Sequence, residues 1–251
     1  MESKQRTSIQ QPAANIPFVS LIIPAYNEEG RIGKTLHTVL QYLEQQPYEW
    51  EVLVVDDGST DQTAAVVAQF PAVKLLQLPE NRGKGAAVKE GMLHARGAVR
   101  VFSDADLSTP ITELPKLLEC IQSGCDVCIG SRALRPELVR RHQPWYRETM
   151  GKIFNVIVQL LVMRGIKDTQ CGFKAFRAEV VETVFPQLQT MGFAFDVEVL
   201  LLARQAGYSI CEIPVLWYND ERSRVHPIRD AAKMLIELLR IRFRHWRRSR
   251  N

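Results

Sequence analysis

The stretch "EVLVVDDGSTD", residues 51–61, is an apolar run that ends abruptly in acidic and hydroxyl residues. A continuous apolar run of this length, bounded by turn residues, is typical of a strand buried on both faces of a sheet. The same build occurs earlier in "FVSLIIPAYN" (18–27) and later in "AVRVFSDAD" (98–106). We therefore expect three buried strands, each followed by polar side chains at its carboxyl end.

Segments with helical apolar spacing separate these strands. The expected helices cover 28–46, 60–70, 83–97 and 111–124, and further strands are expected at 73–81 and 126–132. We expect Ser59 or Thr60 to cap the second of these helices. The alternation predicts an α/β fold, Rossmann-like, with a mostly parallel central sheet and helices on both faces. In such sheets, ligands bind outside the carboxyl ends of the strands.

The chain after Arg132 follows this pattern less closely. We expect an apolar helix at 152–163, a strand or turn at 168–176, a buried helix at 193–207 and an edge strand at 208–218. The predicted organisation is a disordered leader over 1–16, one catalytic domain over 17–226 and a basic amphipathic helix over 227–251, a candidate for membrane contact.

Composition and charge limit the class of protein. The chain has 251 residues, 46% of them hydrophobic, with a net charge of +4, and residues 222–251 carry ten Lys or Arg against two acidic residues. Such a tail favours an anionic surface or ligand, but it lacks the interleaved aromatic residues of a nucleic-acid binder. The polar start shows no signal peptide, and the longest apolar run, 153–163, is too short to span a bilayer. We expect a cytoplasmic protein that meets the inner face of a membrane, if at all, from the side.

The five cysteines show no disulfide framework. They are Cys120, Cys125, Cys128, Cys171 and Cys211. Cys125 and Cys128 lie three residues apart in "CDVCIG", which is expected to be a strand, so their side chains face opposite sides and a zinc site is not expected. We therefore predict reduced cysteines in a reducing compartment.

Asp104 and Asp106 are the first candidate site residues. If the strand continues that far, the two carboxylates lie on one side of the chain, because side chains of a strand alternate. Two carboxylates facing a crevice suit Mg²⁺ or Mn²⁺, which take one or two protein oxygens and fill their other positions with phosphate and water. The alternative is an acidic turn that caps the helix beginning at Ile111.

Other polar residues are expected at the same edge. Asp57 is a candidate acceptor for a base-ring N–H, and one of Asp56 and Asp57 is expected only to cap the following helix. The segment "NRGKG" brings Arg82 and Lys84 to a helix N-terminus, where a pyrophosphate is favoured. Three residues after the first strand are candidates to line the binding site of a base and ribose: Pro24, Tyr26 and Glu28.

Several motifs together resemble the family-2 inverting glycosyltransferases, which have the GT-A fold. The motifs are "SLIIPAYNEEGRI", "VVDDGSTD", "ENRGKGAAVKEGM", "DADLSTP", "IGSR", "DTQCGFKAF", "FDVEVLLLA" and "EIPVLW", in that order over about residues 18–245. Their order and spacing are most similar to the dolichyl-phosphate β-glucosyltransferase branch, with the dolichyl-phosphate mannose synthases as near cousins. The membrane helix that eukaryotic relatives carry before the catalytic domain has no counterpart in this sequence.

The resemblance implies roles for individual residues. It implies that Asp104 and Asp106 bind the metal. It also implies two further catalytic candidates: Asp168, which matches a position at the acceptor side, and Asp196, which occupies the place where many family-2 enzymes keep an acidic base. It implies a nucleotide-sugar site made of Pro24, Tyr26, Glu28, Val55, Asp57, Arg82, Lys84, Asp104, Ala105, Arg132 and Arg224. It implies an acceptor side made of Arg132, Arg147 and Gln170.

The chemistry of the acceptor decides whether a base is needed. A sugar hydroxyl must lose its proton, whereas a phosphate monoester has a second pKa of about 6 and is already anionic at neutral pH. The arginines of residues 132–147, next to the apolar 153–163 segment, suit a phosphate head with an apolar tail. The alternative is a solvated basic loop over a core helix.

These observations lead to one prediction and its alternatives. We predict a metal-dependent enzyme that transfers glucose from UDP-glucose to a polyprenyl or dolichyl phosphate. The alternatives are another donor such as GDP-mannose, a hydroxyl acceptor, or a nucleotidyltransferase, although that last class typically has a glycine-rich loop after its first strand. The sequence specifies no oligomeric state and no nucleic-acid partner.

Overall fold

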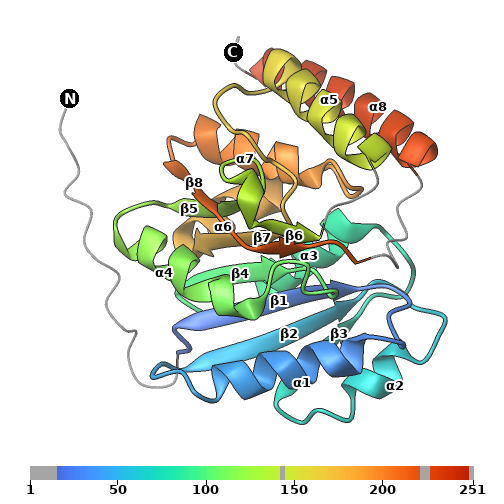
Figure 1. The fold of residues 1–251 in the computed structure, drawn as a ribbon, viewed down its shortest axis with the longest axis vertical. Helices are drawn as coiled ribbons and strands as arrows, with labels where there is room; N and C mark the ends of the chain where they lie inside the picture. Colours follow the sequence, from blue (N-terminus) through green and yellow to red (C-terminus); the bar gives the residue numbers. More distant parts are fainter. Residues whose placement is uncertain (1–15, 142–144, 221–226, 249–251) are drawn as a thin grey trace.

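A central sheet forms the frame of the molecule. The computed structural model describes residues 16–141, 145–220 and 227–248. Within them, a seven-stranded sheet has the order β3-β2-β1-β4-β7-β5-β8 (Figure 1). Its strands are β1 Val19–Ala25, β2 Trp50–Asp56, β3 Val73–Gln77, β4 Val99–Ser103, β5 Val127–Ser131, β7 Phe173–Arg177 and β8 Ile210–Pro214. A small second sheet pairs β6, Val139–Arg141, with β9, Trp217–Tyr218.

Helices cover both faces of this sheet, as predicted. They are α1 Ile32–Leu43, α2 Thr63–Val67, α3 Lys84–His94, α4 Leu114–Gln122, α5 Trp145–Leu161, α6 Ala178–Val184, α7 Phe195–Gln205 and α8 Pro227–Arg248. The apolar sides of α1 and α4 pack on one face, and those of α3, α6 and α7 pack on the other. The predicted α/β class with a mostly parallel sheet is therefore confirmed; β7 alone runs antiparallel to its neighbours β4 and β5.

Alternation along the strands divides the core into two layers. On β2, Val52 and Val54 pack with α1 and α4, whereas Leu53 and Val55 pack with α3. All four side chains are essentially inaccessible to solvent. Burial on both faces explains why these strands read as continuous apolar runs rather than as alternating ones.

The loops that follow β1 and β2 hold each other. The Asn27 backbone N–H donates to Ser59 Oγ at 2.8 Å, and the Thr60 N–H donates to Asn27 Oδ1 at 2.8 Å. Asn27 reaches this position with a φ of 54°, in the left-handed region that asparagine tolerates. Because Ser59 and Thr60 serve this contact, neither caps a helix, and α2 begins only at Thr63. The helix expected over 60–70 is present but shorter than predicted, and the predicted cap was wrong.

The pair of helices α5 and α8 lies side by side beyond α7 (Figure 1). Glu198 of α7 joins α8 to the domain: its Oε1 is 2.7 Å from Arg244 Nη1 and 3.0 Å from His245 Nε2. Its Oε2 accepts the Thr190 N–H at 2.6 Å. These charge-assisted hydrogen bonds lower the pKa of Glu198 to about 2, although burial alone would raise it. The predicted C-terminal helix is thus docked on the domain.

One expectation about the cysteines was wrong. A disulfide joins Cys125 and Cys211, whose Cα atoms are 6.2 Å apart. The two residues are 86 positions apart in the sequence, and only the pairing of β5 with β8 brings them together. Cys125 also precedes β5 rather than lying in it. The spacing of the cysteines in the sequence therefore could not predict this disulfide.

Candidate active site

Asp104 and Asp106 follow β4, at the carboxyl edge of the sheet. The strand ends at Ser103, and the Leu107 N–H donates to Asp104 O at 3.1 Å, so a turn brings the two carboxylates together. Leu107 has a φ of 48°, a strained value for a branched side chain. The two carboxylates were expected to lie on one side of a continuing strand. That expectation was wrong, because the strand ends at Ser103 and a turn follows it.

Lys84, at the start of α3, faces Asp104. Its Nζ lies 2.5 Å from Asp104 Oδ1. Burial opposes the charge on Lys84, but the carboxylates of Asp104 and Asp196 outweigh it and raise the pKa of Lys84 above its ordinary value. Gly172 covers the other side of Asp104, where a Cβ atom would overlap the carboxylate. The glycine of "DTQCGFK" therefore leaves the space that the Asp104 carboxylate occupies.

Asp106 carries negative charge that its surroundings do not fully balance. Burial, followed by the charge of Asp104, raises the pKa of Asp106, while the Ser108 N–H, which donates to its Oδ1 at 2.8 Å, acts in the opposite direction. Two carboxylates in one turn, one of them paired with a lysine and the other under-compensated, are a donor set that suits a hard divalent cation. The residues present therefore fit Mg²⁺ or Mn²⁺.

Asp57 and the glycine-rich turn meet beside this pair. Asp57 Oδ1 accepts the Arg82 N–H at 2.9 Å and its Oδ2 accepts the Gly83 N–H at 2.8 Å. Burial raises the pKa of Asp57, against the effect of these two donors. Gly83 has a φ of 101°, and a Cβ there would lie 2.5 Å from Met191 O. Asp57 thus positions the turn that leads into α3, in which Arg82 precedes the N-cap Gly83 and Lys84 is the first helical residue.

The remaining candidates for the nucleotide side lie on β1 and β2 or just beyond them. Pro24 and Val55 are partners in the register of the two strands, and the Val55 side chain is fully buried in the core. Tyr26 is 38% exposed at the end of β1. Glu28 forms an ion pair with Arg31. The structure therefore gives Val55 a packing role and leaves Tyr26 accessible.

Arg31 was not anticipated from the sequence. Arg31 pairs with Asp220 as well as with Glu28: Arg31 Nη1 lies 3.1 Å from Asp220 Oδ2. Asp220 and Asp106 line a cavity of about 390 Å³, which Arg141 also borders.

Ala105 was predicted to contact the nucleotide. The structure shows that it is buried and that its carbonyl oxygen accepts a hydrogen bond from the Thr35 hydroxyl at 2.5 Å.

Asp168 and Arg132 form a bidentate pair. Arg132 Nε donates to Asp168 Oδ2 at 2.7 Å and Nη2 donates to Oδ1 at 2.8 Å. Burial favours the neutral acid, but Arg132 outweighs it and lowers the pKa of Asp168. The guanidinium also lies 5.4 Å from the centroid of the Trp217 ring. Asp168 thus orients Arg132 and stays ionised.

Asp196 is paired with a lysine that sequence reasoning missed. Lys174 Nζ lies 2.6 Å from Asp196 Oδ1, and the two side chains are only 1% and 4% exposed. Burial raises the pKa of Asp196, while the charges of Lys174 and Lys84 act against it. The sequence does contain a sign of this pair: a lysine lies in the middle of the apolar strand "FKAF", and a charge buried there requires a partner of opposite charge.

A second cavity, of about 500 Å³, adjoins two of the residues predicted for the acceptor, Arg132 and Gln170. Arg132, Gln170 and Trp217 line it, together with Lys152 of α5 and Lys167. Lys167 was not anticipated either. Of the other predicted residues, Arg224 lies outside the described part of the chain, and so does the side chain of Arg147. The arginines of residues 132–141 do not gather in one place, because Arg132 and Arg141 line different cavities.

Comparison with known proteins assigns the chain to a family. Residues 20–185 match the sequence pattern of Glycosyl transferase family 2, well over half of the chain. The chain belongs to this family. The resemblance inferred from the motifs is thereby confirmed, and the protein is a glycosyltransferase.

Relatives of this family 2 glycosyltransferase align along nearly its whole length. It is 37% identical to a dolichyl-phosphate beta-glucosyltransferase, ALG5D, of Trichomonas vaginalis, over 92% of this chain and 78% of the relative. It is 36% identical to the dolichyl-phosphate beta-glucosyltransferase of Saccharomyces cerevisiae, over 90% of this chain and 74% of the relative. Glucosyl-3-phosphoglycerate synthase of Mycobacterium tuberculosis, solved with Mn²⁺, UDP and glucosyl-3-phosphoglycerate, has the same fold at 17% identity. The TM-score is 0.68, and the alignment covers 94% of this chain and 87% of that one.

Proposed function

We propose that this glycosyltransferase passes glucose from UDP-glucose to a polyprenyl phosphate such as dolichyl phosphate. The names of the relatives aligned over most of the chain support this proposal. The neighbour of the same fold that was solved with UDP and Mn²⁺ supports the choice of a uridine donor.

The cavity of about 500 Å³ is the observation that carries the proposal. Three cations, Arg132, Lys152 and Lys167, border it together with two acidic residues, Glu148 and Asp168, so cations are in excess. Val156 and Trp217 supply apolar walls. Asp104 also acts on Arg132: burial opposes the charge, but Asp168 and, more weakly, Asp104 raise the pKa of Arg132. A phosphate bound here would therefore lie beside the Asp104 site, with an apolar neighbour for a lipid tail.

The pairing of Asp168 and Asp196, the two predicted base candidates among the described residues, favours a phosphate acceptor over a hydroxyl. A general base must come within hydrogen-bond reach of the proton that it removes. Asp168 is held by Arg132, and Asp196 is buried against Lys174. A phosphate monoester attacks as an anion and needs no such base. In this proposal Asp168 positions Arg132, and Asp196 positions Lys174 and Lys84.

Asp104 and Asp106 are the residues that would hold a divalent metal, Mg²⁺ or Mn²⁺. When bound, the metal neutralises charge that develops on the departing nucleoside diphosphate. Lys84, at the start of α3 and 2.5 Å from Asp104, presents further positive charge to the same place. Asp57 keeps that helix end in position through its two backbone hydrogen bonds.

The exposed sides of α5 and α8 are proposed to rest on the bilayer that supplies the acceptor. Among the described residues, none of the helices combines the length and apolarity needed to cross a membrane. On α5, Ile153, Val156 and Leu160 form an exposed apolar stripe, and Leu160 is 70% exposed. The counterpart on α8 is formed by Leu235, Ile236, Leu239 and Phe243.

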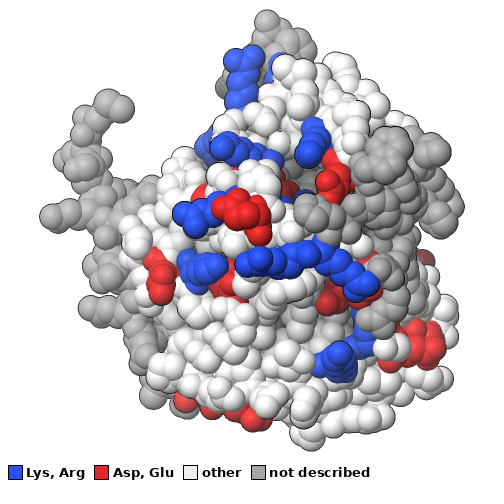
Figure 2. Space-filling view, viewed as in Figure 1, with Lys and Arg blue, Asp and Glu red and all other residues white. Residues whose placement is uncertain are grey.

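Basic residues accompany this apolar surface. Lys233, Arg240 and Arg242 of α8 are exposed beside it, and Figure 2 shows lysine and arginine side chains on the part of the molecule where α5 and α8 lie in Figure 1. Each basic residue near an anionic leaflet adds about 1 kcal/mol of attraction. An apolar face with flanking cations suits a helix pair lying in the membrane interface.

A donor and acceptor screen tests the proposal. Purified protein is incubated with radiolabelled UDP-glucose or GDP-mannose and with either a short polyprenyl phosphate or the matching polyprenol, and the products are extracted into organic solvent. We expect label only from UDP-glucose with the phosphate. Transfer to the polyprenol, or from GDP-mannose alone, contradicts the proposal.

Variants test whether the acceptor binds in the cavity. Lys152→Gln combined with Lys167→Gln is expected to raise the KM for the polyprenyl phosphate and to leave the KM for UDP-glucose unchanged. Lys34→Gln, which removes an exposed cation of α1, is the matched control. Equal effects on both KM values would place the acceptor elsewhere.

A further inference from the structure

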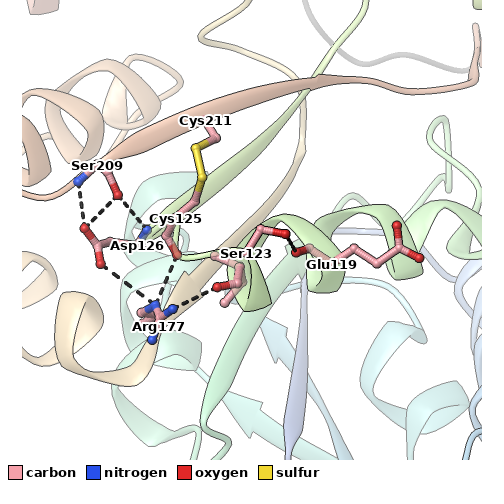
Figure 3. The surroundings of a disulfide bond; sticks show 8 residues. Glu119, Ser123, Cys125, Asp126, Arg177, Ser209 and Cys211 are labelled. Carbon is pink, nitrogen blue, oxygen red and sulfur yellow. Dashed lines mark hydrogen bonds and ion pairs between the residues drawn. A yellow bond between two sulfur atoms is a disulfide. The ribbon is translucent and has the colours of Figure 1, made fainter. Parts of the chain in front are cut away.

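Four of the five cysteines gather where α4, β5 and β8 meet. Cys125 and Cys211 form the disulfide (Figure 3). The sulfur of Cys120, near the end of α4, lies within 4.8 Å of both disulfide sulfurs. The thiol of Cys128, the next cysteine along β5, hydrogen-bonds to Cys120. Cys120, Cys125 and Cys211 are all partly exposed, so the three-sulfur cluster is open to solvent.

We propose that Cys120, Cys125 and Cys211 form a thiol–disulfide exchange site, in which Cys120 is the attacking thiol. This site lies outside the catalytic machinery and adds a chemical modification to the protein. It does not depend on the proposed function.

The exchange step balances within the protein. The Cys120 thiolate attacks the sulfur of Cys125 or Cys211, and a new S–S bond forms to Cys120. The Cys125–Cys211 bond breaks, and its electron pair leaves on the other sulfur, which takes the proton that Cys120 gave up. The number of disulfides and thiols is unchanged, so the step needs no oxidant or reductant.

Hydrogen bonds that do not involve sulfur hold the backbones of the cluster. Ser209 N–H and Oγ donate to Asp126 Oδ2 at 2.7 and 2.8 Å, and the Asp126 N–H donates to Ser209 Oγ at 3.0 Å, which links the chain next to Cys125 with the start of β8. Arg177 Nε donates to Cys125 O at 3.1 Å and its Nη2 to Ile121 O at 2.8 Å, which links Cys125 with the end of α4 (Figure 3). The three sulfurs therefore stay near one another whichever pair is bonded.

The connection between Cys120 and Cys125 leaves room for the alternative bond. The Cys125 N–H donates to Cys120 O at 3.3 Å, so the two residues already close a tight turn. Gly124 in that turn has a φ of 104° and open space around it.

The environment of Cys120 also favours its thiolate. The hydrogen bond from the Cys128 thiol lowers the pKa of Cys120, against the effect of burial. Burial, followed by that same contact, raises the pKa of Cys128. Cys128 is fully buried whereas Cys120 is partly exposed, so Cys120 is the thiol that a reagent or the disulfide can reach. Cys120 is the reactive thiol of the group.

Tryptic cleavage distinguishes the possible disulfides. Cys120, Cys125 and Cys128 all lie in the peptide 117–132, whereas Cys211 lies in the peptide 205–222. The native disulfide therefore links two peptides. A Cys120–Cys125 disulfide closes a ring within one peptide, and tandem mass spectrometry identifies the pair.

The experiment uses the full-length protein equilibrated in a buffer of reduced and oxidised glutathione, quenched with acid, alkylated and digested. In Cys211→Ser we expect a Cys120–Cys125 disulfide, and in Cys125→Ser a Cys120–Cys211 disulfide, each in a yield similar to that of the native bond. Cys120→Ser should abolish every pair except the native one. Cys171→Ser, whose sulfur lies outside the cluster, is the matched control.

Two results would overturn the proposal. One is that Cys120 stays a free thiol, or carries only glutathione, in both the Cys125→Ser and the Cys211→Ser protein. The other is that Cys128→Ala leaves the rate of Cys120 alkylation at pH 7 unchanged, since loss of the hydrogen bond should slow it. Both readouts are independent of glycosyl transfer.

Discussion

The buried pair of Lys174 and Asp196 allows a prediction with a defined size. Lys174 Nζ lies 2.6 Å from Asp196 Oδ1, 2.5 Å from Cys171 O and 5.1 Å from the centroid of the Phe102 ring. Lys174→Met keeps the apolar stem against Phe102 and removes only the charge, which leaves the Asp196 carboxylate buried without its partner. Breaking one side of a buried ion pair costs about 3–5 kcal/mol in the free energy of unfolding. We expect the lower end, because Lys84 also attracts Asp196.

The pH dependence of this loss has a definite sign. Without Lys174, burial raises the pKa of Asp196 further above its ordinary value of 3.8, so the folded variant binds a proton that the unfolded chain releases. Stability of the variant then falls as the pH rises through the interval between these two pKa values, by up to about 1.4 kcal/mol for each pH unit. The deficit relative to the wild type should be larger at pH 8 than at pH 5.

Urea unfolding of four proteins measures this effect. The set is the wild type, Lys174→Met, Asp196→Asn and the double variant, each at pH 5 and pH 8. We expect the double variant to lose less than the sum of the single losses, because neither charge is then left alone in the core. Additive losses, or a Lys174→Met protein as stable as the wild type, would refute the argument that the two charges depend on each other.

Three further predictions concern the site and the two outer helices. Asp104→Asn should lower turnover at least about 100-fold with an unchanged unfolding midpoint, and EDTA should abolish wild-type activity until Mg²⁺ or Mn²⁺ is restored; activity retained in EDTA would contradict the metal site. Glu198, with its pKa lowered to about 2 from 4.5, contributes on the order of 3 kcal/mol that is fully present above pH 4.5 and is lost as the pH falls toward 2. In urea titrations, Glu198→Gln should therefore be less stable than the wild type at pH 7 by an amount that shrinks between pH 5 and pH 3. Leu160→Asp combined with Phe243→Asp should abolish sedimentation with anionic liposomes, whereas Leu93→Asp, which changes an exposed leucine of α3, should not.

The strands at the active-site edge could be predicted because their signal is local. Residues 52–55 and 21–23 are apolar on both faces, and the polar residues that follow within a few positions mark where each strand stops. Asp104 and Asp106 were found in the same way. The start of α2 was predicted wrongly because it depends on a neighbouring loop: Ser59 accepts a hydrogen bond from the Asn27 N–H in the loop after β1.

Partners distant in the sequence could not be predicted at all. Cys125 and Cys211 are 86 positions apart, and nothing near either one indicates the other. Lys174 stood out as a charge in an apolar strand, but its partner Asp196 lies 22 positions away on α7, and only the folded structure brings the two together. The same holds for Asp168, which the sequence presented as a catalytic acid and the structure pairs with Arg132.

The amino-acid sequence by itself determined the α/β class, the edge of the sheet where the chemistry lies, and the acidic pair that suits a metal. These depend on periodicity and on side-chain types within a few residues, which the chain expresses before it folds. Only the tertiary structure decided which charges are free to act and which are neutralised by a partner, and which cysteines meet. Both outcomes depend on distances between segments that β-strand pairing and helix packing bring together, and a linear sequence does not contain those distances.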